Sequence, residues 1–324
     1  MLLVTGATGH IGRELVRELD ARGAAFRVLV RDPARAAGLP ERAERVAGDL
    51  DKPATLAPAL DGVDRLFLLV PGIGVEHTEH AIAAAKAAGV RRIVYLSSYA
   101  VIGDPIPAMG RWHHEREQLI RVCGIPATFL RPCGFMTNAF DWVPTLREGG
   151  YVLDPVGPGR AAPVDPADIA AVAAVTLTED GHEGEEYLLT GGEVFTVAEQ
   201  VQILAKAIGR DIEVRTVATP AEAVRFRYPH GAPQALADAL IEGLTLMRAD
   251  TAGVRSDTVQ RLLGCEPRTF ADWCARNAHA FPGQPPPEPA ATPEGGLRTQ
   301  RRLNPAQPGP TPPPADLRTD RKIT

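Results

Sequence analysis

The chain has 324 residues, of which 44% are hydrophobic and 23% are charged, and its formal net charge at pH 7 is −5. These values suit a globular protein with one large domain or two smaller ones. Its basic residues are scattered, so neither nucleic acid nor an anionic membrane is expected as a partner. No apolar run approaches the roughly 18 residues that a membrane span needs, and no basic leader precedes the first apolar run, so we expect a cytoplasmic protein. The four cysteines have no CxxC or zinc-finger spacing, so we expect reduced thiols and no metal site.

Up to about residue 150, short apolar runs alternate with helical patterns, which predicts βαβ units and a parallel sheet. The expected strands are 2–5, 26–30, 45–47, 65–70, 92–97 and 127–130, and the expected helices are 11–22, 53–60, 77–88 and 112–122. Several of these strands are continuous apolar runs, which is typical of a sheet covered by helices on both faces. We therefore predict an α/β fold with a doubly wound, Rossmann-type domain over residues 1–150.

The pattern loosens between residues 151 and 281, where we predict a smaller α/β lid that binds the substrate and is partly interleaved with the sheet. Its expected helices are 165–177, 196–208, 220–226, 233–247 and 269–281, and its expected strands are 186–190 and 212–217. Residues 282–324 are rich in Pro and Gly with few aliphatic residues, so we predict a disordered tail. The alternative is that this tail forms a polyproline helix that binds a protein partner.

Three glycines, Gly6, Gly9 and Gly12, lie at GxxGxxG spacing between the first expected strand and the first expected helix. In a dinucleotide-binding turn, the first glycine allows the tight turn, the second lets the backbone approach the pyrophosphate, and the third lets the helix lie close to the strand. The backbone amides of the intervening residues then face the anion, and those residues include Thr8, His10 and Ile11. We expect the side chain of His10 to be exposed rather than to act as a ligand.

The segment after the second strand bears on the choice between NADP and NAD. Arg31 comes first and Arg35 follows one helical turn later, and arginine at this position accommodates the 2′-phosphate of NADP. Asp32 is the competing candidate, because an acidic residue here would bind the ribose 2′-hydroxyl of NAD. We favour NADP(H), since Arg31 is closest to the end of the strand.

Several segments together resemble the NmrA-like atypical short-chain dehydrogenase/reductases, and most closely their quinone oxidoreductase branch. The resemblance rests on Gly6 to Gly12, residues 29–33, Gly48-Asp49-Leu50, residues 83–90, Tyr95-Leu96-Ser97-Ser98, His113 to Glu117, Gly124-Ile125-Pro126, Arg131-Pro132, residues 135–138, 164–169 and 187–191. It covers residues 1–281 and implies a Rossmann domain with a small lid. It also implies that Asp49 and Leu50 lie near the adenine, and that Val70, Pro71 and Gly72 lie beside the nicotinamide ribose.

Most short-chain reductases donate a proton through the tyrosine of a Tyr-x-x-x-Lys pair, yet no tyrosine of this chain is followed by lysine four residues later. His113 and Glu117 occupy the matching place, on one helix face. A carboxylate near an imidazole favours its charged form, so we predict that this pair donates the proton, a purely structural pair being the alternative.

Ser97 and Ser98 are expected to hydrogen-bond the oxygen of the acceptor, although a Ser-Ser at a strand end is often only a turn. Residues after the sixth strand are expected to line the substrate pocket, with core packing as the alternative. These pocket residues are Cys133, Phe135, Met136, Asn138 and Phe140.

The missing tyrosine and lysine bear on the type of acceptor. Reduction of a quinone gives a delocalised anion that water can protonate, whereas reduction of a simple ketone gives a localised alkoxide that needs an acid. We therefore predict an NADPH-dependent oxidoreductase that acts on a quinone-like or conjugated small molecule. The alternatives are a non-catalytic NADP(H) sensor of the NmrA type, and an isomerase or biosynthetic tailoring enzyme that uses the bound cofactor.

Overall fold

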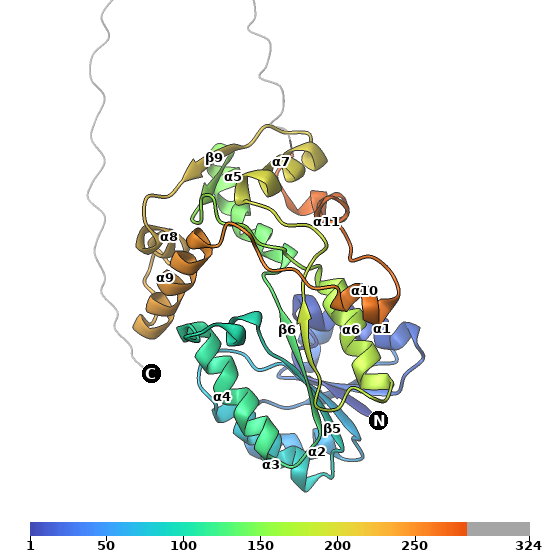
Figure 1. Cartoon of the computed structure of the whole chain (residues 1–324). Coiled ribbons are helices and arrows are strands. Elements are labelled where there is room, and N and C mark those ends of the chain that lie inside the picture. The colour runs from blue at the N-terminus through green and yellow to red at the C-terminus, as the bar shows by residue number, and fades with distance from the viewer. Residues whose placement is uncertain (284–324) are drawn as a thin grey trace, which may run out of the picture. The chain divides into compact units, whose positions relative to one another are not determined.

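Seven parallel strands form the main sheet of the computed structural model, which describes residues 1–283, and they run in the order β3-β2-β1-β4-β5-β6-β8. Figure 1 shows helices on both sides of this sheet. The strands are β1 (Leu2–Val4), β2 (Phe26–Val30), β3 (Glu44–Ala47), β4 (Arg65–Leu68), β5 (Arg92–Leu96), β6 (Ala127–Pro132) and β8 (Glu186–Leu189). The predicted doubly wound α/β fold is confirmed, and the six strands predicted before residue 150 differ by at most two residues at either end.

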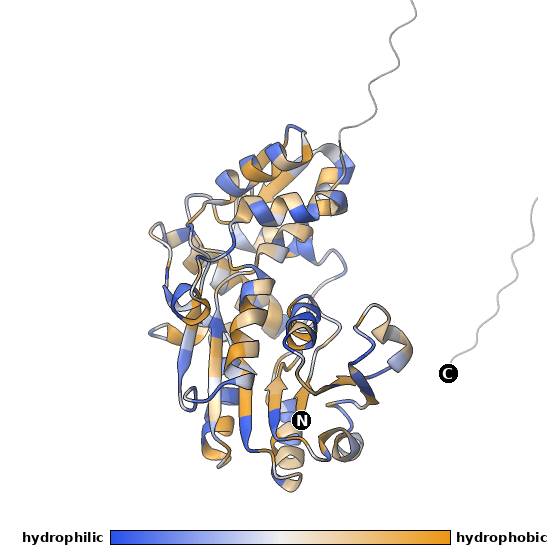
Figure 2. Cartoon of the chain, turned by 90° about the vertical axis from the view of Figure 1, so that its right-hand side faces the viewer, coloured by the Kyte–Doolittle hydropathy of each residue, from blue (hydrophilic) through white to orange (hydrophobic). Residues whose placement is uncertain are grey.

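Helices cover both faces of this sheet because its strands bury side chains on both sides. In β1, Leu2 and Val4 belong to one apolar cluster and Leu3 belongs to another. The first cluster includes residues of α1 (His10–Ala21) and α6 (Pro166–Thr178), and the second includes residues of α2 (Leu56–Leu60), α3 (Glu76–Ala87) and α4 (Ala108–Val122). The strand ribbons are mostly orange in Figure 2, as the continuous apolar runs predicted.

Two elements of the predicted lid return to this sheet. Strand β8 pairs with β6 as the seventh strand, and α6 packs against α1 on one face. Asp165 caps the start of α6 by accepting a hydrogen bond from the Ala167 amide. The chain therefore crosses from the sheet into the second region and back again, so that region is interleaved with the Rossmann fold.

The second region is built around a small parallel sheet of β7 (Tyr151–Asp154) and β9 (Glu213–Thr216). Its helices are α5 (Val143–Gly149), α7 (Val197–Ile208), α8 (Pro220–Arg227), α9 (Gln234–Ala249) and α11 (Phe270–Asn277). The helix α10 (Thr258–Leu263) instead packs on α6 and β8 of the main sheet. An apolar cluster that includes Leu146, Val201 and Trp273 joins several of these elements. Thr196 and Glu199 form a capping box at the start of α7.

Short 3-10 helices fill the connections: η1 (Pro33–Ala36), η2 (Pro53–Thr55), η3 (Tyr99–Ile102), η4 (Met136–Trp142) and η5 (Ala278–Ala280). The predicted helix 269–281 is shorter than expected, because its last turn is η5. Of the predicted disordered tail, residues 284–324 lie outside the described residues. Within residues 1–283, no helix is both long enough and apolar enough to cross a membrane.

Candidate cofactor and substrate site

The site lies at the carboxyl edge of the main sheet, where the strand order changes direction between β1 and β4. Thr5 joins these strands, since its hydroxyl donates to the Leu69 carbonyl at 3.0 Å and accepts from the Leu69 amide at 2.8 Å. In doubly wound sheets, dinucleotides bind in the crevice at this point, between the loops that follow the two strands. Here those loops are the turn from Gly6 to Gly12 and the segment from Val70 to Gly74.

The glycine-rich turn has the backbone that a phosphate-binding turn requires. Gly6 has a φ of 68°, in the left-handed region that favours glycine, and its carbonyl accepts from the Gly9 amide at 3.0 Å. A Cβ atom added to Gly12 would lie 2.1 Å from the Gly6 carbonyl oxygen, so only glycine fits where α1 begins. The residues present therefore fit a dinucleotide pyrophosphate at the start of α1.

Side chains around the turn support it rather than fill it. The Nε of Arg13 donates to the Thr8 carbonyl at 3.0 Å, and the Ile11 side chain is buried in the core, which leaves only the Ile11 backbone for a ligand. His10 is exposed, as predicted, and its ring centre lies 5.7 Å from that of Phe140 in η4.

Both candidate residues for contacting the adenosine ribose follow β2, where dinucleotide-binding folds place this contact. Arg31 follows β2 with an exposed side chain, whereas Oδ1 of Asp32 accepts from the Ala34 amide at 3.0 Å and caps η1. The backbone of Arg35 lies within η1. The pKa of the Asp51 carboxyl is lowered by a 2.5 Å hydrogen bond with His77 and also by the charge of Arg31, so Arg31 lies close to this segment.

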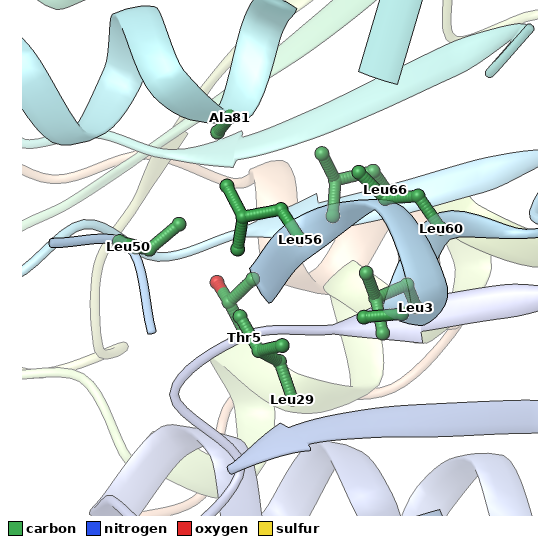
Figure 3. Close-up of a pocket in the computed structure, with 9 residues that line it drawn as sticks. Leu3, Thr5, Leu29, Leu50, Leu56, Leu60, Leu66 and Ala81 are labelled. Atoms are coloured by element: carbon green, nitrogen blue, oxygen red, sulfur yellow. The ribbon is translucent and has the colours of Figure 1, made fainter. Parts of the chain in front are cut away.

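Asp49 and Leu50, which the resemblance places near the adenine, follow β3. The Asp49 amide donates to Thr55 Oγ1, and the Leu50 carbonyl lies 2.7 Å from Nδ1 of His80. The Leu50 side chain points inward to a small cavity that is lined by Thr5 and aliphatic residues of the sheet, α2 and α3 (Figure 3). This cavity measures about 10 Å³, room for one water at most, and it is too small for any part of a cofactor.

The other loop at this point of the sheet is the one that follows β4. Val70 is buried, whereas Pro71 and Gly72 are exposed at the edge of the sheet. Nδ1 of His77 lies 3.4 Å from the Pro71 carbonyl, and Arg116 of α4 donates to carbonyls of the same loop. Arg116 was not predicted, since a charged residue on an amphipathic helix is usually interpreted as part of a solvated face.

The predicted electrostatics of His113 are wrong. Burial and the guanidinium of Arg116 lower the pKa of His113 to about 4, and the Glu117 carboxylate raises it too little to compensate. Nδ1 of His113 lies 3.2 Å from the hydroxyl of Tyr95. The imidazole is therefore neutral at neutral pH and is not the charged proton donor that the i, i+4 spacing suggested.

Glu117 is fully buried and takes part in a hydrogen-bonded network with basic side chains. It accepts from Nε of Arg131 at 3.0 Å, from NH2 of Arg121 at 3.2 Å and from the Ser97 hydroxyl at 2.6 Å. Burial alone would raise the pKa of Glu117, but these hydrogen bonds outweigh it, so the net pKa is lowered. The single hydroxyl proton of Ser97 is thus directed to Glu117, which corrects the expectation that Ser97 faces an acceptor oxygen.

The hydroxyl of Ser98 is better suited than that of Ser97 to contact a substrate. Its oxygen accepts from the Ala100 amide at 3.2 Å and caps η3, an interaction that does not use the hydroxyl hydrogen. Tyr99 follows in η3 and was not predicted, because no lysine accompanies it. Burial raises the pKa of Tyr99, and Cys133 and Asp250 act in the same direction, so these three residues gather beyond the ends of β5 and β6.

The predicted pocket residues divide between surface and core. Cys133 is buried, which raises the pKa of its thiol to about 12, and Met136 is packed in the apolar cluster of the second region. Core packing, the stated alternative, therefore describes Met136. Phe135 is half-buried and Asn138 is exposed. Phe140 stacks on Phe281 with ring centres 5.6 Å apart.

A family model described as NAD(P)H-binding matches residues 6–180. The chain belongs to this NAD(P)H-binding family. It is 37% identical over 284 residues to an NAD(P)H azoreductase of Xenophilus azovorans, a match that covers 87% of this chain and 99% of the relative. It is 38% identical over 282 residues to a (4-alkanoyl-5-oxo-2,5-dihydrofuran-3-yl)methyl phosphate reductase of Streptomyces griseus, again covering 87% of this chain and 99% of the relative.

A solved structure with the same fold is the NADPH-dependent quinone oxidoreductase of Escherichia coli in complex with NADPH. It is 30% identical, with a TM-score of 0.74, and the match covers 85% of this chain and 99% of that one. The predicted likeness to atypical short-chain dehydrogenase/reductases with quinone reductase relatives is confirmed. The chain is accordingly an NAD(P)H-dependent oxidoreductase, as predicted.

Proposed function

We propose that this protein is an NADPH-dependent reductase of electron-poor, conjugated small molecules such as quinones. Bound NADPH would supply a hydride to the acceptor. The turn from Gly6 to Gly12 would hold its pyrophosphate, Arg31 its 2′-phosphate, and the loop from Val70 to Gly74 its nicotinamide half.

The observation that carries the choice of acceptor is the state of the residues that were expected to deliver a proton. His113 is neutral and half-buried beside Tyr95, and Glu117 is ionised and bound by Arg131. Neither side chain holds a proton that it readily gives up near pH 7. This arrangement suits an acceptor whose reduced form is a delocalised anion, because water can protonate such an anion without help from the protein.

The relatives support the same class of acceptor. An azo group, an oxo-dihydrofuran ring and a quinone are each conjugated, electron-poor systems, and the related proteins are named for reducing them. The Ser98 hydroxyl, whose oxygen but not hydrogen caps η3, and the Tyr99 phenol, which its raised pKa keeps protonated, would donate hydrogen bonds to the oxygen of an acceptor.

The test is to follow NADPH oxidation with a panel of quinones and with simple ketones of similar size, using the wild type and His113→Ala. We expect turnover of quinones but not of ketones. The kcat of His113→Ala should stay within about tenfold of the wild type, because a general acid contributes about 10² or more to the rate and His113 does not act as one. Turnover of ketones that depends on His113 would contradict the proposal. No turnover of any acceptor, with tight discrimination between NADPH and NADP+, would favour the sensor instead.

A further inference from the structure

The side chain of Arg116 is 1% exposed, which is unusual for an arginine, and it lies beneath the loop that follows β4. Its Nε donates to the Gly74 carbonyl at 2.7 Å, NH2 donates to the Gly72 carbonyl at 2.8 Å, and NH1 lies 3.5 Å from the Val70 carbonyl. All three acceptors are backbone oxygens of one five-residue loop. A planar fork of donors can hold three carbonyls at once in this way, whereas a lysine ammonium cannot match the geometry.

These contacts determine how the loop presents its backbone. Peptide units are planar and trans, so a carbonyl that turns toward Arg116 turns the following N–H group away. The amides of Ile73 and Val75 therefore point away from the guanidinium. The side chain of Ile73 is 45% exposed, which leaves an apolar group on the outer surface of the same loop.

The position of the loop connects it to the cofactor. In dinucleotide-binding sheets of this kind, the residue after the second strand contacts the adenosine ribose, so the adenosine half is expected over β1 and β2. The other mononucleotide half is then expected over β4 and the strands that follow it. We propose that Arg116 is a positioning residue that fixes the wall of the crevice contacting the nicotinamide half of NADPH. This inference rests on the proposed function, because it assumes that NADPH occupies the crevice.

Calorimetric titration with two probes tests the proposal, since NADPH spans the whole crevice and adenosine 2′,5′-bisphosphate occupies only the adenosine side. We expect Arg116→Met to raise the Kd for NADPH by about tenfold or more, equivalent to about 1.4 kcal/mol, and to leave the Kd for adenosine 2′,5′-bisphosphate within about twofold of the wild type. Arg116→Lys keeps the charge but not the fork, and its Kd for NADPH should fall between those of Arg116→Met and the wild type.

Arg92 provides a matched control. It is also buried, and it hydrogen-bonds Glu183 and the Glu179 carbonyl from the first residue of β5, at the opposite edge of the sheet. Arg92→Met should lower the melting temperature without changing either Kd. If Arg116→Met does not fold, Arg116→Lys is used, with amide hydrogen exchange of residues 70–76 as a second measurement. Exchange there should be faster in Arg116→Lys than in Arg92→Met.

Three results would overturn the inference. Equal weakening of both probes in the Arg116 variants would indicate a general loss of structure, and unchanged binding of NADPH, or unchanged exchange of residues 70–76, would show that Arg116 does not shape the wall. Failure of the wild type to bind NADPH would instead appear before any substitution and would overturn the proposed function as well.

Discussion

The hydroxyl of Tyr95 and Nδ1 of His113 lie 3.2 Å apart on the face of the sheet that α4 covers. Burial raises the pKa of Tyr95 to about 12, whereas burial and Arg116 lower the pKa of His113 to about 4. At neutral pH a neutral phenol thus meets a neutral imidazole. The pair contributes to the packing of α4 on β5. Protonation of His113 therefore affects the stability of the fold and not the donation of a proton to a substrate.

We expect His113 to make the fold sensitive to acid. Its pKa is about 4 in the folded chain and about 6.5 when unfolded, so the stability linked to its neutral form is complete above pH 6.5 and is lost as the pH falls toward 4. That loss should reach about 3 kcal/mol at most. Urea unfolding at pH 7 and pH 4.5 should show a smaller loss for His113→Gln than for the wild type. His114→Gln, on the next position of the same helix, should behave like the wild type, and equal losses in all three proteins would contradict the expectation.

Glu117 is expected to stabilise the folded chain and not to transfer a proton. Glu117→Gln would leave the partly buried Arg131 without its buried carboxylate, and breaking such a pair costs about 3 to 5 kcal/mol. Glu186→Gln is the matched control, because Glu186 pairs with the same Arg131 but is far more exposed. We expect the control to cost about 1 kcal/mol or less. A Glu117→Gln variant that keeps its unfolding free energy but loses kcat would instead assign Glu117 a catalytic role.

The turn at Gly12 should not tolerate even one methyl group. A Cβ atom in Gly12→Ala would overlap the Gly6 carbonyl, so the turn must shift, at a cost of about 1 to 3 kcal/mol in stability. The Kd for NADPH should rise by tenfold or more, because the amides that face the pyrophosphate move with the turn. Gly243 lies on helix α9, and the new methyl group of Gly243→Ala meets no atom within 4 Å other than the backbone of its own helix. That variant should be neutral or up to about 1 kcal/mol more stable, with unchanged binding. Tight NADPH binding by Gly12→Ala would show that the turn does not bind the cofactor.

The sheet could be predicted from the sequence because each strand carries its own local signal. A mostly apolar run between two turns, such as Phe26–Val30, can be recognised without knowledge of the strands that it pairs with. Strand β7 was missed although β3 and β8 have the same length, because it belongs to a separate two-stranded sheet in which it pairs with β9, about sixty positions away. The helices α5 and α10, with seven and six residues, were missed as well.

The site was predicted less completely for a different reason. The spacing of His113 and Glu117 correctly placed both on one helix, but it contained no information about burial or about Arg131, which comes from another element. Desolvation and that distant arginine decide which protonation state each side chain adopts. The contacts of Arg116 with the loop after β4 likewise depend on how α4 packs, and no local pattern encodes that packing.

Arg31 should decide the preference for NADPH over NADH. Its exposed side chain follows β2 beside Asp51, whereas Asp32, the competing residue, already caps η1 through the Ala34 amide. In Arg31→Ala the 2′-phosphate would lose a charge-assisted contact of about 1.5 to 3 kcal/mol, which corresponds to roughly a tenfold or greater rise in the Kd for NADPH. Binding of NADH should not change, since NADH has no phosphate at that position. Arg42→Ala, an exposed arginine beyond the end of η1, is the control for a general loss of positive charge. Titration of each variant with both nucleotides measures the effect. Equal weakening of NADPH and NADH binding by Arg31→Ala would contradict this role of Arg31. If the protein preferred NADH and Asp32→Ala weakened only the binding of NADH, the Asp32 carboxylate would be the group that contacts the ribose.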